Sequence, residues 1–412
     1  MRTYILLLSI LLAASACSDS TRVRSSDSSS GTDALSATDA VDGMDQNDSQ
    51  SGADATDGSS VTDALDGLDV SDSTSAADGT SGGDGADMTT SSDGLDMADT
   101  MDANDSSDGV TGVASPLVDP NCVDGQWSEQ LPLTAANLSP AINSYSANTA
   151  TEFILQALSI RYPTGQWIVE GGLQSDAFGG TNCIDAFLGN KSSAGAVIGQ
   201  LSTIVHECGH FFDLDQGGFF DSAYMLTPTM VNTCSGASYQ GSDATFARSL
   251  IKNDEYNALR PPCGGSFVPG CDSYADIYLN GDPNDSNFDS GDQAFNMLHE
   301  ETTQYVNSIA TGYAFSDQYQ FTVSERDGIL TFLWYTCRYL RMARLQYPGS
   351  YSVLTQSPCW REAILRVWGR AWLFLEATKD MQNLGISDDE IETLLTEELL
   401  QEIQLVRDAH GC

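Results

Sequence analysis

The chain has 412 residues and a formal net charge of −41, from 58 acidic and 17 basic residues. Such an acidic balance disfavours binding to nucleic acids or to anionic membrane surfaces, because both depend on patches of Lys and Arg. We therefore expect no nucleic-acid partner. The stretch 116–412 is long enough to form a large core or two lobes.

Residues 1–16 are typical of a signal peptide, with Arg2, a short apolar run and small residues before Cys17. The run is too short to span a bilayer as a mature helix. The small residues before Cys17 resemble a bacterial lipobox, which would make Cys17 the lipidated first residue of an exported lipoprotein. We then expect an outer-membrane or cell-surface protein that contacts the membrane only through its lipid. The alternative is ordinary cleavage after Ala16 and secretion.

Residues 17–115 contain mostly Ser, Asp, Gly, Ala and Thr, and no aromatic residue. From Asp27 to Asp108 every third position is Asp, Ser or Thr. This period fits neither a helix nor a strand, and the composition predicts a disordered, self-repelling linker. The alternative is a stalk that collects calcium ions.

The spacing of apolar residues from position 116 onward predicts a folded α+β domain at 116–412. We expect a helix over 148–162 that Pro163 ends, and strands over 166–170 and 183–188, each bounded by glycine. We expect a longer helix over 193–213, stopped by the glycine pair 217–218.

This longer helix carries the pattern H-E-x-x-H, as His206, Glu207 and His210. Histidines four residues apart lie on one face of a helix, so both imidazoles can bind one zinc ion. Glu207 then has the position of the general base that activates a metal-bound water. The alternative is a pair of ordinary helical histidines.

Residues 219–292 are predicted to form a loop-rich insertion. It ends in an acidic stretch where Asp282, Asp285 and Asp289 could surround a Ca²⁺ ion. The stretch does not follow the EF-hand pattern, and a polar surface turn is the alternative.

The remainder, 293–412, is predicted to be a helical lobe. The expected helices are 295–309, 325–347, 360–379 and 388–409, the last with Ser387 and Glu390 as a capping box. The first of these helices carries three candidates for a third metal ligand, which are His299, Glu300 and Glu301. On a helical wheel Glu301 lies closer to the apolar face than Glu300 does, so burial alone favours Glu301.

The chain has ten cysteines. We assign Cys17 to lipidation and expect Cys208 to be a buried free thiol. A disulfide at Cys208 is expected to distort the helix that presents both histidines and thereby to exclude the zinc site. The other eight can form four disulfides in an oxidising compartment, although the sequence does not indicate their pairing. These eight are Cys122, Cys183, Cys234, Cys263, Cys271, Cys337, Cys359 and Cys412.

The segment from His206 to His210 resembles the zinc-binding helix of the zincin metallopeptidases. The metzincin branch is excluded, since Asp213 and Gln216 replace its glycine and third histidine. Residues 297–306 are similar to the N-E-G-x-A-x-Y segment of aminopeptidase N-like gluzincins. Glu300 and Tyr305 keep the spacing of that segment, whereas His299, Glu301 and Thr303 depart from it.

The resemblance implies a zincin-like fold, with a small sheet whose edge strand lines the substrate cleft before the metal helix. It also implies Glu300 as the third zinc ligand, which we prefer over Glu301 and His299. Within the resemblance Tyr305 occupies the tyrosine position, and a tyrosine can stabilise an oxyanion. Tyr313 and Tyr224 remain alternatives for that role.

We therefore expect an exported zinc peptidase that hydrolyses peptide bonds of a peptide or protein substrate with a metal-activated water. The alternative is a catalytically inactive surface lipoprotein whose fold is held together by zinc. The sequence indicates neither the cleavage specificity nor the oligomeric state.

Overall fold

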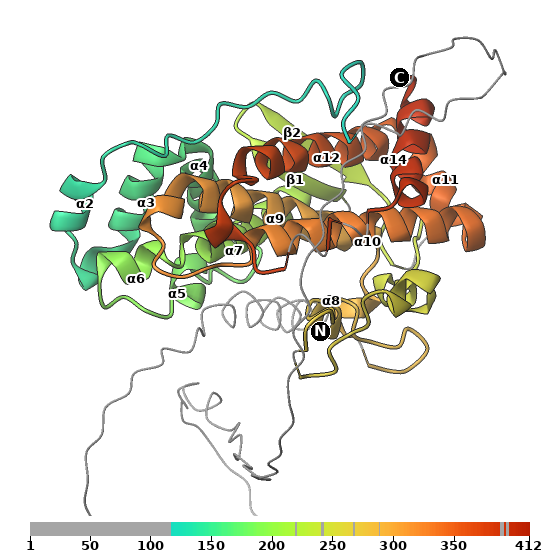
Figure 1. Cartoon of the computed structure of the whole chain (residues 1–412), viewed down its shortest axis with the longest axis horizontal. Helices are drawn as coiled ribbons and strands as arrows, with labels where there is room; N and C mark the ends of the chain where they lie inside the picture. The colour runs from blue at the N-terminus through green and yellow to red at the C-terminus, as the bar shows by residue number, and fades with distance from the viewer. Residues whose placement is uncertain are drawn as a thin grey trace, which may run out of the picture. The chain divides into compact units, whose positions relative to one another are not determined.

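The computed structural model describes residues 117–218, 221–239, 243–266, 268–287, 289–387, 391–392 and 395–412. The predicted signal peptide, the lipidation site Cys17 and the linker 17–115 lie outside the described residues. So does Glu390 of the predicted capping box. The described part is mostly helical, with one two-stranded antiparallel sheet (Figure 1). The fold class α+β therefore holds in its coarse sense.

Short and medium helices precede the metal-binding helix. They are α2 (Ser139–Asn143), η1 (Ala147–Thr149), α3 (Ala150–Arg161), α4 (Pro163–Gln174), α5 (Cys183–Phe187) and α6 (Ala194–Ile198). The predicted helix 148–162 corresponds to α3. Pro163 does not only end that helix, because it also occupies the first turn of α4, where a proline needs no amide donor.

The two predicted strands are wrong, since 166–170 lies inside α4 and 183–188 corresponds to α5. Helix α4 buries Gly165, Ile168, Val169 and Gly172, which follow the spacing of one helical face. Five residues of apolar character do not distinguish a buried helix from a strand. Helix α5 begins because the Asn182 side chain accepts hydrogen bonds from two backbone amides in its first turn.

The metal-binding helix α7 extends from Leu201 to Gly217 and is separate from α6, so the predicted helix 193–213 is two helices. It ends as predicted at the glycine pair. Gly218 has φ of +64°, a conformation that favours glycine and stops the helix.

The predicted loop-rich insertion 219–292 contains regular structure. Strands β1 (Asp221–Thr227) and β2 (Met230–Ser235) form an antiparallel hairpin that pairs Ala223 with Thr233. The remaining elements are short helices, namely η2 (Arg248–Asn253), η3 (Glu255–Ala258), α8 (Ala275–Tyr278) and η4 (Ser290–Asp292). Among the described residues no strand precedes α7, so the sheet expected from the zincin resemblance is not at its predicted place.

The C-terminal part is helical, as predicted. Its elements are α9 (Phe295–Phe315), η5 (Ser316–Gln318), α10 (Glu325–Gln346), α11 (Pro348–Gln356), α12 (Pro358–Thr378), η6 (Gln382–Leu384) and α14 (Glu397–His410). Helix α14 begins later than the predicted start at 388, with Thr396 as its N-cap. Helix α9 packs against α7, α10 and α12, and it is buried on nearly all sides.

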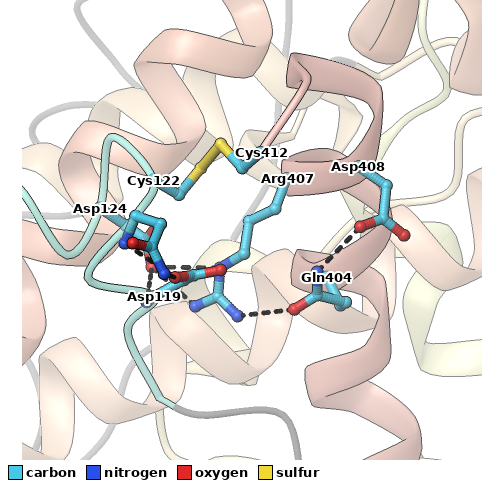
Figure 2. The surroundings of a disulfide bond; sticks show 8 residues. Asp119, Cys122, Asp124, Gln404, Arg407, Asp408 and Cys412 are labelled. Atoms are coloured by element: carbon cyan, nitrogen blue, oxygen red, sulfur yellow. Dashed lines mark hydrogen bonds and ion pairs between the residues drawn. A yellow bond between two sulfur atoms is a disulfide. The ribbon is translucent and has the colours of Figure 1, made fainter.

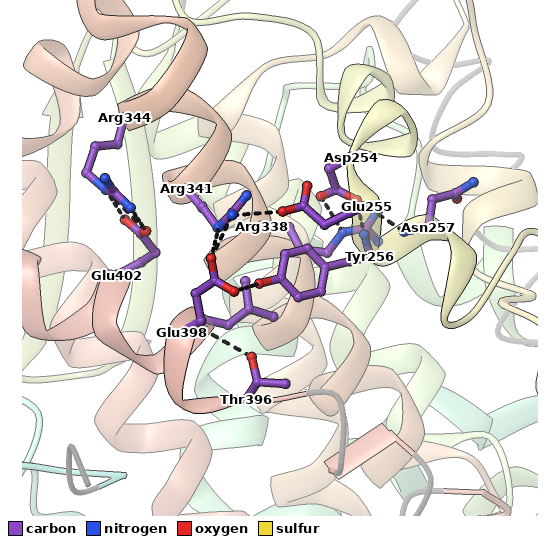
Figure 3. Close-up of polar contacts among 11 residues, drawn as sticks. Asp254, Glu255, Tyr256, Asn257, Arg338, Arg341, Arg344, Thr396, Glu398 and Glu402 are labelled. Atoms are coloured by element: carbon purple, nitrogen blue, oxygen red, sulfur yellow. Dashed lines mark hydrogen bonds and ion pairs between the residues drawn. The ribbon is translucent and has the colours of Figure 1, made fainter. Parts of the chain in front are cut away.

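Ion pairs fix α10 to the insertion and to α14 (Figure 3). Three arginines on successive turns of α10 each meet an acidic partner within 2.8 Å. The pairs are Arg338 with Asp254, Arg341 with Glu398, and Arg344 with Glu402. The insertion is thus attached to the helical lobe by charged as well as apolar contacts.

Four disulfides join Cys122 to Cys412, Cys183 to Cys208, Cys234 to Cys359 and Cys263 to Cys271. The predicted number is met, but the prediction that Cys208 is free is wrong. The free cysteine among the described residues is Cys337, buried in α10. The Cys183–Cys208 bond joins α5 to α7 without interrupting α7, because Cys208 points to α5 rather than to α9.

The bond between Cys122 and Cys412 lies beside a buried ion pair of Arg407 with Asp124, whose N–O distance is 2.6 Å (Figure 2). Both contacts hold α14 to the first described turn of the chain. In the described part of the chain, no helix combines the length and the hydropathy needed to cross a bilayer.

Candidate metal centre

Helix α7 presents the two histidines of the H-E-x-x-H pattern on one face. Their rings lie one turn apart, with centroids 4.7 Å from each other, and both side chains are fully buried. The Nε2 atom of each ring has no hydrogen-bond partner among the described residues. Two buried imidazole nitrogens without partners are costly unless another group binds them.

Helix α9 brings the carboxylate of Glu301 to these two nitrogens. Its Oε2 atom lies 3.6 Å from Nε2 of His206 and 3.5 Å from Nε2 of His210. This oxygen also lacks a hydrogen-bond partner, and the side chain is only 4% exposed. The three residues form a group whose ligand atoms lie within 4.8 Å of one another, so they can hold a metal ion.

The Nδ1 atoms of the two histidines are held by other side chains of α9. His210 Nδ1 lies 2.7 Å from the carboxylate of Glu300, and His206 Nδ1 lies 3.0 Å from the hydroxyl of Ser308. The ionised Glu300 carboxylate can only accept, so it favours hydrogen on Nδ1 of His210, and the Ser308 hydroxyl permits the same tautomer at His206. In this tautomer Nε2 is open to a metal. Such outer partners fix the ring orientation and increase the basicity of a ligand.

The preference for Glu300 as third ligand does not agree with this geometry. Glu300 and Glu301 both approach His210, but they face opposite nitrogens of its ring. The third candidate, His299, lies on another face of α9, against the rings of Tyr224 and Trp360. Burial there lowers the pKa of His299 to about 3, so this histidine is neutral.

Burial lowers the pKa of a histidine, whereas neighbouring carboxylates raise it, and the balance differs between the two histidines of the centre. Burial lowers the pKa of His206 to about 4. Burial also acts to lower the pKa of His210, but the carboxylates of Glu300 and Glu301 outweigh it and raise this pKa to about 10. The binding of a metal ion by His210 therefore requires the release of a proton.

Glu207 lies at the same centre, and its carboxylate makes no hydrogen bond to the protein. The side chain is fully buried, and neither oxygen has a partner among the described residues. Burial raises the pKa of Glu207 to about 8, and the charges of Glu301 and Glu300 add to the increase. A buried carboxyl group with a raised pKa and no hydrogen-bond partner is typical of a catalytic or binding site rather than of a packed core.

A chain of hydrogen bonds connects the carboxylates of Asp213 and Glu300 to α12. Gln304 donates to Asp213 over 2.8 Å and accepts from Asn307 over 2.9 Å. Arg370 of α12 donates to Asn307 over 2.6 Å. Gly209 has no side chain where α7 meets α9, and a Cβ atom at that position would overlap the carboxamide of Gln304. The glycine thus permits the close approach of the two helices.

The sequence analysis did not identify Ser308 and Gln304 as parts of the centre. Gln304 follows Glu301 by three residues and Ser308 by seven on the same helix, spacings that place them along one face of α9. This spacing from Glu301 is the signal in the sequence that predicts both residues as neighbours of the centre.

The three candidate tyrosines have different surroundings. The ring of Tyr305 packs edge-on against His206 with centroids 4.8 Å apart, and its hydroxyl lies 3.1 Å from that of Tyr278. The hydroxyl of Tyr224 instead donates to the backbone oxygen of Asn296. Tyr313 packs against Phe374. Of the three, Tyr305 is the one in contact with a histidine of the centre.

The acidic stretch near the end of the insertion does not gather into a metal-binding group of three within the described residues. The carboxylate of Asp282 accepts from the backbone amide of Asn284, and that of Asp285 accepts from the amide of Asn287. Asp289 caps the short helix η4. These contacts are typical of polar surface turns.

No family model, curated protein or solved structure matches this chain.

Proposed function

We propose that the protein is a zinc-dependent peptidase in which His206, His210 and Glu301 hold the ion. Two imidazoles and one carboxylate are the donor set of many catalytic zinc sites, which keep a further position open for water or substrate. Bound zinc would supply a water of lowered pKa and polarise the scissile carbonyl. This assignment replaces Glu300 by Glu301 as third ligand and gives Glu300 the task of orienting His210.

The observation that carries the proposal is the carboxylate of Glu207. A metal site that only stabilised the fold would not need an additional, unbonded carboxyl group beside its three ligands. With its pKa raised to about 8, Glu207 can exchange a proton near neutral pH. We assign it the removal of a proton from the attacking water and the delivery of that proton to the leaving amine.

Tyr305 is our candidate for the group that stabilises the oxyanion. Its ring contacts His206, and its hydroxyl lies 3.1 Å from the Tyr278 hydroxyl. A phenolic proton in this position can be donated to an oxygen that becomes negative during the reaction.

We also propose that the protein is exported and anchored through Cys17. Four disulfides in the described part are typical of an oxidising compartment. The residues before Cys17 carry the lipobox resemblance described above. The enzyme would then act on peptides outside the cytoplasm while tethered by its lipid.

A second function is favoured by the burial of the centre. Both histidines are fully buried and Glu301 nearly so, so an ion bound there would also crosslink α7 and α9. An inactive lipoprotein stabilised by zinc would need no more than this. If the protein is a peptidase, some of the residues that bury these side chains must move to admit a peptide.

The test compares Glu207→Gln with His206→Ala in the zinc-loaded protein. Glu207→Gln should keep stoichiometric zinc and the fold but lose about 10²–10⁴-fold in hydrolysis of a mixed peptide library, because it lacks only the general base. His206→Ala should lose both zinc and activity. If wild-type protein binds zinc, gains thermal stability from it and cleaves nothing, the structural function is correct instead. Wild-type turnover by Glu207→Gln would show that this residue is not the base.

A further inference from the structure

Arg248 is a buried arginine whose guanidinium is only partly satisfied by the protein. It begins η2, and its backbone amide donates to Gln293 over 2.7 Å, which fixes the start of its side chain. The residue is 1% exposed. Its Nε and Nη1 atoms are buried and have no hydrogen-bond partner among the described residues.

Aromatic contacts connect the guanidinium to the metal centre. Its central carbon lies 5.5 Å from the centroid of the Tyr278 ring. The Tyr278 hydroxyl is 3.1 Å from that of Tyr305, whose ring packs against His206. Burial lowers the pKa of Arg248, and the carboxylate of Glu301 is the charge that opposes this most strongly.

Such an arrangement is unfavourable in the free protein. A buried guanidinium needs several hydrogen bonds or a bonded counter-charge, and contact with an aromatic ring replaces these only in part. Two other fully buried arginines of the domain are bonded to acids, Arg338 to Asp254 and Arg370 to Glu129. Glu301, the acid that acts most strongly on Arg248, would be engaged by the metal.

We infer that Arg248 recognises a carboxylate of the peptide substrate, an inference that rests on the proposed peptidase function. The guanidinium offers two donor atoms without partners, Nε and Nη1, and a carboxylate is a strong acceptor for a hydrogen bond from such a charged group. The carboxylate would bind within the enclosed centre, close to the ion that holds the scissile carbonyl. Arg248 is thereby a specificity-determining residue rather than part of the catalytic machinery.

The carboxylate has two sources in a peptide. It is either the C-terminal main-chain carboxylate, which makes the protein a carboxypeptidase, or the side chain of an Asp or Glu near the scissile bond. Both place the same chemical group against Arg248, and they differ in what C-terminal amidation of the peptide does.

A binding experiment tests the inference apart from turnover. The probe is a mercaptoacyl amino acid, as the free acid and as its amide, whose thiolate binds the metal in both forms. Calorimetric titration of zinc-loaded wild type should give roughly 10–100-fold tighter binding of the acid, the range for a hydrogen bond to a charged group. Arg248→Gln should reduce this ratio to about 1 because it lacks the charge, and Arg248→Lys should give an intermediate ratio.

The matched control is Arg366→Gln, which removes a partly buried arginine whose partner is Glu362. It should retain the wild-type ratio of acid to amide binding. If Arg248→Gln does not fold, the wild type and Arg248→Lys still decide the question. Equal affinity of wild type for acid and amide, together with cleavage that needs no neighbouring Asp or Glu, overturns the inference, as does an undiminished acid preference in Arg248→Lys.

A peptide library with free or amidated C-termini distinguishes the two sources. Loss of cleavage on amidation identifies the main-chain carboxylate. Unchanged cleavage at bonds beside Asp or Glu identifies the side chain. Cleavage that depends on neither overturns the role of Arg248 and leaves the peptidase proposal intact, whereas wild type that binds no zinc and cleaves nothing overturns both.

Discussion

Replacing Glu301 by Gln should weaken zinc binding far more than the same change at Glu300. The exchange keeps the size of the side chain and removes its charge. Glu301 has the oxygen that faces Nε2 of both histidines, at 3.5 and 3.6 Å. Glu300 instead contacts Nδ1 of His210, so its loss leaves three ligand atoms in place.

The magnitude follows from these positions. Zinc binding to structural sites is worth about 10–16 kcal/mol, so one of three protein ligands accounts for about 3–5 kcal/mol, or about 10²–10⁴-fold in affinity. Loss of a side chain that hydrogen-bonds to a metal ligand typically lowers the metal affinity about 10–100-fold. We expect Glu301→Gln to fall in the first range and Glu300→Gln in the second. His299→Gln should not weaken zinc binding, because its ring lies among aromatic side chains away from the centre.

The assay is competition for zinc with a chromophoric chelator at fixed pH. Circular dichroism of each variant shows whether the fold is retained. A larger loss for Glu300→Gln than for Glu301→Gln would refute the ligand assignment and restore the one that the gluzincin resemblance implied. Equal losses would mean that both carboxylates reach the ion.

Two further predictions concern packing and pH. Gly209→Ala should lower the free energy of unfolding by about 1–3 kcal/mol, because its Cβ would overlap the carboxamide of Gln304. Thermal denaturation measures this change, and an unchanged melting temperature would contradict the close contact between α7 and α9. Burial depresses the pKa of His299 from 6.5 to about 3, so the stability from its neutral state is complete above pH 6.5 and is lost as pH falls toward 3. Denaturant unfolding of His299→Phe should therefore depend less steeply on pH in this window, by up to about 1.4 kcal/mol per pH unit, and parallel curves for both proteins would disprove it.

The sequence predicted the helix that carries His206, Glu207 and His210 because two independent signals coincide there. The H-E-x-x-H spacing and the apolar run both require one helical face. The third ligand was not predictable in the same way. The helical wheel favoured Glu301 and the gluzincin resemblance favoured Glu300, and the choice between these adjacent residues depends on how α9 is rotated against α7.

Other errors have similar causes. The apolar run 166–170 is too short for its pattern to distinguish a helix from a strand. In the structure these residues belong to α4, which packs against α7. Counting cysteines correctly predicted four disulfides, but it could not tell which cysteine stays free. The free one, Cys337, is enclosed in α10, whereas Cys208 lies near Cys183 of α5.

The bond between Cys122 and Cys412 makes a covalent ring of the polypeptide between these two residues. A protease that cuts this ring once, in an exposed loop, leaves two pieces that are still joined through sulfur. The helices on either side of the cut then stay at high local concentration, because they cannot diffuse apart. The domain would in this way tolerate a nick that separates a linear chain into fragments, which matters most if the protein is exported as proposed.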